Sequence, residues 1–141
     1  MRLALILALL ASPAAAWEFS ATSICILDHS EEATEMRLTY DPGNGEYAIT
    51  VTRDEPWPEG SIFSMRFDGP MPIFIQTDRH VASDDRRSLT VTDRGFGNVL
   101  NGLQYNSFAL SFLADEMAIV SLVGAAEEVA AFRACTEAGL V

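Results

Sequence analysis

Apolar and polar side chains alternate in short runs along most of this 141-residue chain. In the segment 61–68 the apolar residues are Phe63, Met65 and Phe67, with Ser, Arg and Asp side chains at the positions that follow them. Successive side chains of a β-strand point to opposite faces of its sheet, so this pattern predicts a strand that is buried on one face only. A chain built from many such strands is constrained to a small set of layered β folds.

The same reasoning predicts eight short strands, at residues 23–28, 36–40, 47–52, 61–68, 72–77, 88–92, 107–113 and 117–123. Residues 41–46 read Asp-Pro-Gly-Asn-Gly-Glu, and because Gly and Asn tolerate positive φ, we expect a hairpin there. The connector 114–116 is short enough to make the last two strands an antiparallel pair. Strands at this spacing predict a mainly β (α+β) fold, an antiparallel β-sandwich or barrel.

Two segments depart from the two-residue period and predict helices. Residues 96–104 place apolar side chains at the spacing of an amphipathic helix, although each of two Gly residues costs about 1 kcal/mol against Ala. Residues 124–136 are rich in Ala, with Glu127 and Glu128 in the first turn, where the helix dipole favours anions. In this C-terminal helix Val129, Phe132 and Cys135 share one side, so we expect the Cys135 thiol to face the core.

The N-terminus has the three-part pattern of a secretory signal peptide. Arg2 is followed by an apolar stretch and then by Ala14-Ala15-Ala16, which fits a signal peptidase site before Trp17. The apolar stretch is much shorter than the ~20 residues that span a bilayer. We therefore expect residues 1–16 to be removed, leaving residues 17–141 as a single exported β-rich domain, periplasmic or secreted, with no membrane span.

The chain contains two cysteines, Cys25 and Cys135. In an oxidising compartment such a pair predicts a disulfide, and no Cys-x-x-Cys spacing suggests a metal site. By the chain-entropy model this bond stabilises the fold by roughly 4–5 kcal/mol. We expect it to fasten the C-terminal helix to the first strand.

Composition excludes several classes of function. All nine basic residues are Arg, so the chain lacks the Lys required by Walker A loops, Schiff-base enzymes and Ser-x-x-Lys hydrolases. The formal net charge of −11 opposes binding to nucleic acid or to anionic lipid, because such binding depends on cationic contacts. We expect no nucleic-acid partner.

Two histidines lie among acidic residues. His80 belongs to the polar run 78–85, and His29 precedes Glu31, Glu32 and Glu35. A His beside carboxylates is a candidate general base or metal ligand. Charged turns between strands are common, so we interpret the first run as a solvated loop and the second as a hydrated surface turn. The spacings match no metal site, no Gly-x-Ser-x-Gly occurs, and we assign no catalytic residue, metal or cofactor.

Three aromatic residues are candidates for a binding surface. Trp57 lies between Pro56 and Pro58, which prevents regular strand pairing and predicts an extended, exposed crossing. Rigid exposed aromatics are over-represented at interaction hot spots, so Trp57 is the best candidate. Trp17 and Tyr105 are the others, and His80 is a possible binding residue in the neighbouring loop region.

Several short strings resemble a group of small, uncharacterised exported proteins of alphaproteobacteria. They include Phe67-Asp68-Gly69-Pro70, Thr77-Asp78-Arg79-His80 and Ala131-Phe132-Arg133-Ala134-Cys135. Members of that group often carry the label of the ATPase component of the ABC excinuclease, an excision-repair protein. We reject this role, since that component is a large cytoplasmic DNA-dependent ATPase and this chain is acidic and devoid of Lys. The C-terminal end is also similar to that of invasion-associated locus B proteins, which are periplasmic β-domains with a C-terminal helix.

The leading hypothesis is a non-enzymatic periplasmic domain that binds a protein or cell-envelope component. It is based on a cross-linked β scaffold in a sequence without a catalytic motif. One alternative is a small periplasmic hydrolase that uses His80 with a neighbouring Asp. Another is a periplasmic inhibitor of an enzyme such as lysozyme.

Overall fold

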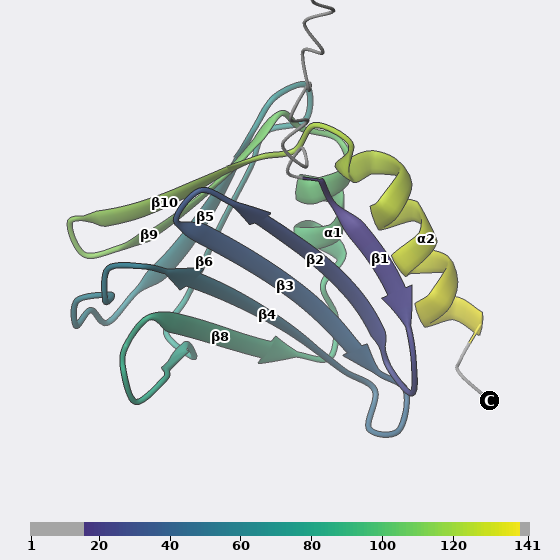
Figure 1. Cartoon of the computed structure of the whole chain (residues 1–141), viewed down its shortest axis with the longest axis horizontal. Helices are drawn as coiled ribbons and strands as arrows, with labels where there is room; N and C mark the ends of the chain where they lie inside the picture. The colour runs from purple at the N-terminus through teal and green to yellow at the C-terminus, as the bar shows by residue number, and fades with distance from the viewer. Residues whose placement is uncertain (1–15, 139–141) are drawn as a thin grey trace, which may run out of the picture.

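A computed structural model describes residues 16–138, where ten strands form two antiparallel sheets with two helices beside them (Figure 1). The predicted signal segment, apart from Ala16, lies outside the described residues. The six-stranded sheet has the order β1 (Glu18–Ala21), β2 (Cys25–Glu31), β3 (Thr34–Asp41), β4 (Glu46–Arg53), β8 (Ser88–Asp93) and β7 (Val81–Ala82). The four-stranded sheet has the order β10 (Glu116–Ser121), β9 (Phe108–Leu113), β5 (Phe63–Asp68) and β6 (Ile73–Thr77).

The predicted mainly β fold is confirmed, and the two sheets are not closed into a barrel. All eight predicted strands are present, with ends displaced by three residues at most. The hairpin of β3 and β4 and the antiparallel pair of β9 and β10 are also as predicted. Gly45 has a φ of 70° and donates its N–H to the Asp41 carbonyl, which closes the β3–β4 turn.

Two strands are not in the prediction. β1 carries no buried side chain and has no clear alternation, so its sequence gives no strand signal. It is held by pairing with β2 and by the Phe19 N–H, which donates to a Glu128 carboxylate oxygen at 2.8 Å. β7 is two residues long, which is too short for any periodicity to show.

The inward side chains of both sheets form one hydrophobic core together with the buried sides of the helices. Helix α1 (Gly97–Gln104) contacts β5, β6 and β9, whereas α2 (Ala125–Ala138) contacts β1 and β2. The helices also contact each other, and Figure 1 shows them together at one side of the two sheets. In the described part of the chain, no helix is long and apolar enough to cross a membrane.

The predicted disulfide is confirmed. Cys25 at the start of β2 and Cys135 in α2 are joined, with their Cα atoms 6.1 Å apart. Both residues are buried, and α2 buries the side predicted from the sequence: Ala125, Val129, Phe132 and Cys135. The bond fastens α2 to β2, the second strand, because β1 precedes it.

Candidate functional site

A cleft of about 460 Å³ lies between the two sheets, and we take it as the candidate functional site. One wall comes from β4 and β8 of the six-stranded sheet, and the other comes from β5 and β6 of the four-stranded sheet. The first turn of α1 adds the remaining residues. Ligand pockets of small-molecule binding proteins have volumes of about 300–1,000 Å³, so this cleft is large enough to hold a small molecule.

The floor of the cleft is apolar. It is lined by inward side chains of four strands and by the beginning of α1: Ile49, Phe63, Met65, Ile75, Val91, Phe96 and Val99. Ile75 and Val91 are only partly buried, although they pack against the core. Protein interiors are normally close-packed, so partly buried aliphatic side chains around an open volume indicate a surface available to an apolar ligand.

An ion pair connects the two sheets at the cleft. Arg79 follows β6, Asp93 ends β8, and the Arg79 Nη2 atom donates to Asp93 Oδ2 at 2.9 Å. Both side chains line the cleft and remain accessible, with 64% and 43% of their surface exposed. The pair places polar groups beside the apolar floor without adding net charge.

Asp93 is held in its ionised form by two donors. The Arg94 backbone N–H donates to Asp93 Oδ1 at 2.7 Å, and this hydrogen bond is the main cause that lowers the pKa of Asp93. The hydrogen bond from Arg79 lowers the pKa further. A stable carboxylate at this position keeps the ion pair intact under ordinary conditions.

The beginning of α1 supplies further polar groups to the cleft. Gly97, Asn98 and Val99 line it, and the first hydrogen bond of the helix runs from the Leu100 N–H to the Phe96 carbonyl. The first N–H groups of a helix have no partner within the helix, and no side chain caps this one. The first turn of α1 therefore places hydrogen-bond donors near an otherwise apolar surface.

His80 lies close to this region but is not assembled into a catalytic dyad. Its Nε2 atom lies 2.9 Å from the Gly60 carbonyl oxygen, so Nε2 carries the proton, and the ring packs 6.1 Å from Phe63. Its Nδ1 atom is buried without a hydrogen-bond partner. Among residues 16–138, no hydrogen bond or ion pair joins His80 to a carboxylate. The polar run around it is a loop on either side of the short strand β7.

The predicted exposure of Trp57 is wrong. The prolines do keep its segment out of both sheets, but the Trp57 side chain is 1% exposed. Its indole N–H donates to the Val51 carbonyl, and its ring packs edge-on against Phe63. Trp17 is also buried, whereas Tyr105 is 46% exposed. The tryptophans thus contribute to the core, and neither is on the surface in this conformation.

The second acidic run is not the surface turn that we predicted. β2 continues to Glu31, so the turn contains only Glu32 and Ala33, and His29 faces inward with 4% exposure. The alternation that buries Cys25 and Leu27 simply continues to His29. A polar residue at the third inward position gave no apolar signal, which is why the predicted strand ended at Asp28.

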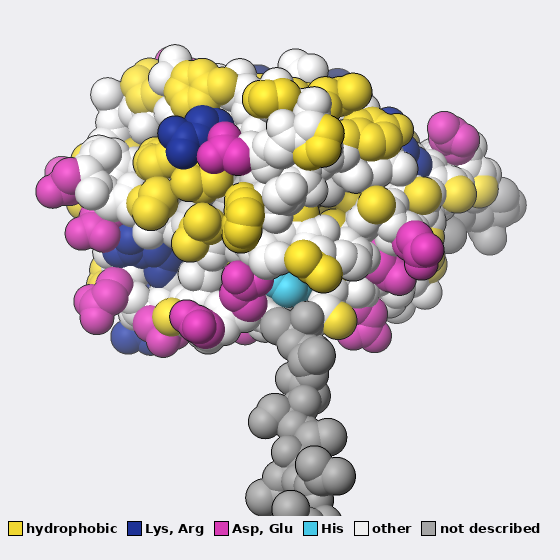
Figure 2. Space-filling view, turned by 90° about the horizontal axis from the view of Figure 1, so that it is seen from above, with side chains coloured by type: hydrophobic (Ala, Val, Ile, Leu, Met, Phe, Trp, Pro, Cys, Tyr) yellow, Lys and Arg dark blue, Asp and Glu magenta, His cyan; other side chains and the backbone are white. Residues whose placement is uncertain are grey.

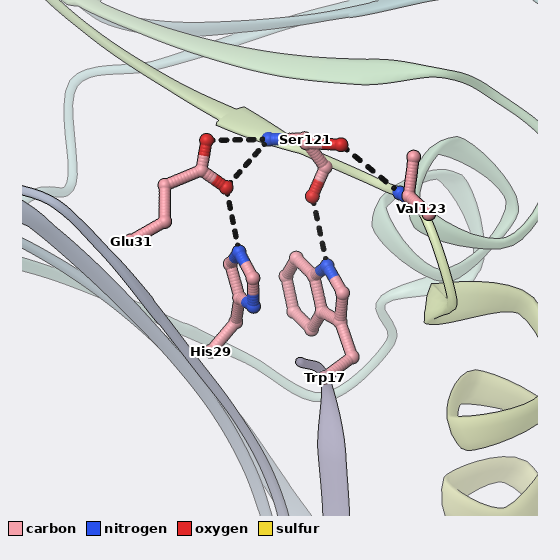
Figure 3. Close-up of polar contacts among 5 residues, drawn as sticks. All are labelled: Trp17, His29, Glu31, Ser121 and Val123. Carbon is pink, nitrogen blue, oxygen red and sulfur yellow. Dashed lines mark hydrogen bonds and ion pairs between the residues drawn. The ribbon is translucent and has the colours of Figure 1, made fainter. Parts of the chain in front are cut away.

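His29 belongs to a hydrogen-bonded cluster that joins three segments of the chain (Figure 3). Its ring stacks on Trp17 with centroids 4.5 Å apart, and its Nε2 atom lies 2.7 Å from Glu31 Oε2. Glu31 accepts the Ser121 N–H, and the Trp17 indole N–H donates to the Ser121 carbonyl at 2.9 Å. The cluster connects the N-terminal segment and β2 to the end of β10, and its burial indicates a structural role.

Neither a metal centre nor a known relative identifies the site. Among residues 16–138, no group of three or more His, Cys, Asp or Glu side chains is placed to hold a metal ion. Comparisons with protein-family models, curated proteins and solved structures find no match. The cleft, which joins residues from four strands and one helix, is not predictable from any single motif in the sequence.

Proposed function

We propose that this protein is an exported, non-enzymatic binding domain that holds a small, mainly apolar molecule with one uncharged polar end. The observation that carries the proposal is the open cleft of about 460 Å³ with an aliphatic and aromatic floor. Burying apolar surface yields about 25 cal/mol per Å², so a ligand that covers this floor gains most of its affinity there. A small apolar component of the cell envelope has this chemistry.

The polar end of the ligand is expected to be uncharged. Arg79 and Asp93 compensate each other, so the cleft offers no unbalanced positive charge to an anion. The formal net charge of −11 adds a repulsive field for anionic ligands. A hydroxyl or amide group can accept from the first N–H groups of α1 or from Arg79 without this electrostatic cost.

Export is supported by the N-terminal sequence and by the disulfide. Disulfides persist mainly in oxidising compartments, and the Cys25–Cys135 bond closes nearly the whole domain. Trp17 is buried in the core, whereas Ala16 is exposed. Signal-peptidase cleavage before Trp17 would therefore leave the buried Trp17 side chain in the mature protein, in the periplasm or outside the cell.

A binding experiment with decanol and decanoate tests the proposal. Decanol is expected to displace the apolar fluorescent probe N-phenyl-1-naphthylamine from the purified, oxidised protein at a stoichiometry of one, and to bind more tightly than decanoate. The substitution Val91→Phe fills the cleft and is expected to weaken decanol binding at least tenfold. Thr92→Phe is the matched control, because Thr92 is exposed and adjacent on β8 but does not line the cleft.

The contrary outcomes are equally specific. Failure of the probe and decanol to saturate the protein would overturn the proposal, as would unchanged binding in Val91→Phe with the fold intact by circular dichroism. Turnover of generic ester, peptide or glycan substrates that disappears in His80→Ala would instead support the hydrolase alternative.

A further inference from the structure

The outer face of the four-stranded sheet is apolar and unpartnered. Figure 2 shows hydrophobic side chains gathered on the molecule as seen from above, with an adjoining basic and acidic side chain among them. The strand positions that point away from the core carry Phe74 on β6, Phe108, Leu110 and Phe112 on β9, and Met117 and Ile119 on β10. Four of these side chains, Phe74, Phe108, Met117 and Ile119, are 46–58% exposed.

One ion pair lies at the centre of this face. Arg66 and Asp68 are outward residues of β5, and the Arg66 Nε atom donates to both Asp68 carboxylate oxygens at 2.9 and 3.2 Å. The Arg66 guanidinium also lies 5.4 Å from the Phe112 ring centroid. Within the four strands these are the only charged side chains that point outward, so the face as a whole is neutral.

The charge of the molecule makes this face unusual. Copies with a formal net charge of −11 repel each other, so two copies can approach closely only through a surface without excess charge. The outer face of the four-stranded sheet meets that requirement and offers contiguous apolar area. Exposed apolar patches of this kind commonly mark sites of protein association.

The order of the two charges makes the face complementary to itself. Consider a twofold axis that lies between two facing sheets, perpendicular to β5 and level with Phe67. It would bring Arg66 of each copy opposite Asp68 of the other. Since Leu110 and Phe108 pair with Arg66 and Asp68 across the β5–β9 ladder, it would also set Leu110 of one copy opposite Phe108 of the other. An axis parallel to β5 would instead set like charges against each other.

We propose that the protein forms a twofold dimer in which the outer faces of the four-stranded sheets pack together with the β5 strands antiparallel. Four strands at ~4.8 Å and six residues at ~3.3 Å give a face of roughly 20 by 20 Å. This is smaller than the ~800 Å² per partner of a standard interface. The dimer is therefore weak and reversible, with a transition between about 10 µM and 1 mM protein.

Charge reversal tests both the surface and its geometry. Sedimentation equilibrium of the wild-type protein is expected to show a monomer–dimer transition. Arg66→Asp leaves two acidic side chains on the face and Asp68→Arg leaves two basic ones, so each variant alone is expected to stay monomeric at 1 mM. An equimolar mixture of the two variants is expected to recover dimerisation, because two acidic side chains then face two basic ones.

Arg37→Asp is the matched control. Arg37 forms a comparable exposed ion pair with Asp28 on the six-stranded sheet, and its reversal changes the net charge by the same amount as Arg66→Asp. It is expected to leave dimerisation unchanged within about twofold. The proposal fails if the wild type remains monomeric at 1 mM, if the mixture does not associate, or if this face binds phosphatidylcholine vesicles in place of a second copy.

Discussion

The guanidinium group of Arg53 lies over the ring of Trp57, 4.4 Å from its centroid, and both residues are buried. Arg53 also donates to Glu116 at 2.9 Å and to the carbonyl oxygens of Glu55, Pro56 and Met117. Because Glu116 and Met117 belong to β10, this arrangement connects the two sheets. The segment that contains Trp57 is therefore fixed against the core even though it pairs with no strand.

Trp57→Ala is expected to lower the free energy of unfolding by about 3–5 kcal/mol. The substitution removes a fully buried aromatic side chain and leaves the buried Arg53 without the ring beneath it. Urea unfolding followed by circular dichroism measures the change. Tyr105→Ala, at a 46% exposed position, is the control and is expected to stay within about 0.5 kcal/mol of the wild type.

The contrast between Trp57 and the strands shows what sequence patterns can predict here. The strands follow from local alternation, which depends only on neighbouring residues. The burial of Trp57 depends on Arg53, Phe63 and the Arg86 guanidinium, which donates to the carbonyls of Trp57 and Pro58. These partners come from different sheets and loops, so flanking prolines alone suggested exposure when the tertiary contacts determine burial.

Cys25→Ser is expected to lower the free energy of unfolding by about 2–5 kcal/mol. The bond connects α2 to β2 across 110 residues, so its loss frees a large loop in the unfolded chain. Thermal unfolding in non-reducing buffer measures the effect, and reduced wild type is expected to match the variant. An unchanged melting temperature in Cys25→Ser would contradict the stabilising role of the bond.

Gly102→Ala is expected to destabilise the protein by about 1–3 kcal/mol, although Ala favours helices. A Cβ atom at this position of α1 would lie 2.4 Å from the ring of Phe67, which is fully buried. Gly97→Ala is the matched control in the same helix, because nothing lies within 4 Å of its added Cβ. Its stability is expected to be unchanged or raised by up to about 1 kcal/mol.

A double variant identifies the cause. If the clash with Phe67 sets the cost, Gly102→Ala is expected to cost less in a Phe67→Leu background than in the wild type, with a coupling of at least about 0.5 kcal/mol. Equal costs in both backgrounds would show that another contact is responsible. The sequence alone assigned both glycines a similar penalty, because close approach of a helix to a buried ring is a tertiary feature.

The cleft lay beyond sequence reasoning for the same reason. Arg79 and Asp93 were visible only as charged residues near strand ends, 14 positions apart. They meet because β6 and β8 belong to different sheets whose ends come together at the cleft. The outward apolar face had a partial local signal, since β9 reads Phe-Ala-Leu-Ser-Phe-Leu with large apolar residues on both of its faces.

The Asp93 carboxyl is expected to titrate below its ordinary value of 3.8, because the Arg94 backbone N–H and then Arg79 lower its pKa. A carboxyl whose pKa is depressed in the folded state stabilises the fold above its unfolded pKa, and this contribution is lost as the pH falls through the folded pKa. Carboxyl NMR titration measures the midpoint directly. Arg79→Ala is expected to raise the midpoint while leaving it below 3.8, since the larger cause, the Arg94 hydrogen bond, remains. A midpoint in the wild type at or above 3.8 would show that the ion pair at the cleft does not form in solution, and the compensated charge on which an uncharged ligand end was inferred would be lost with it.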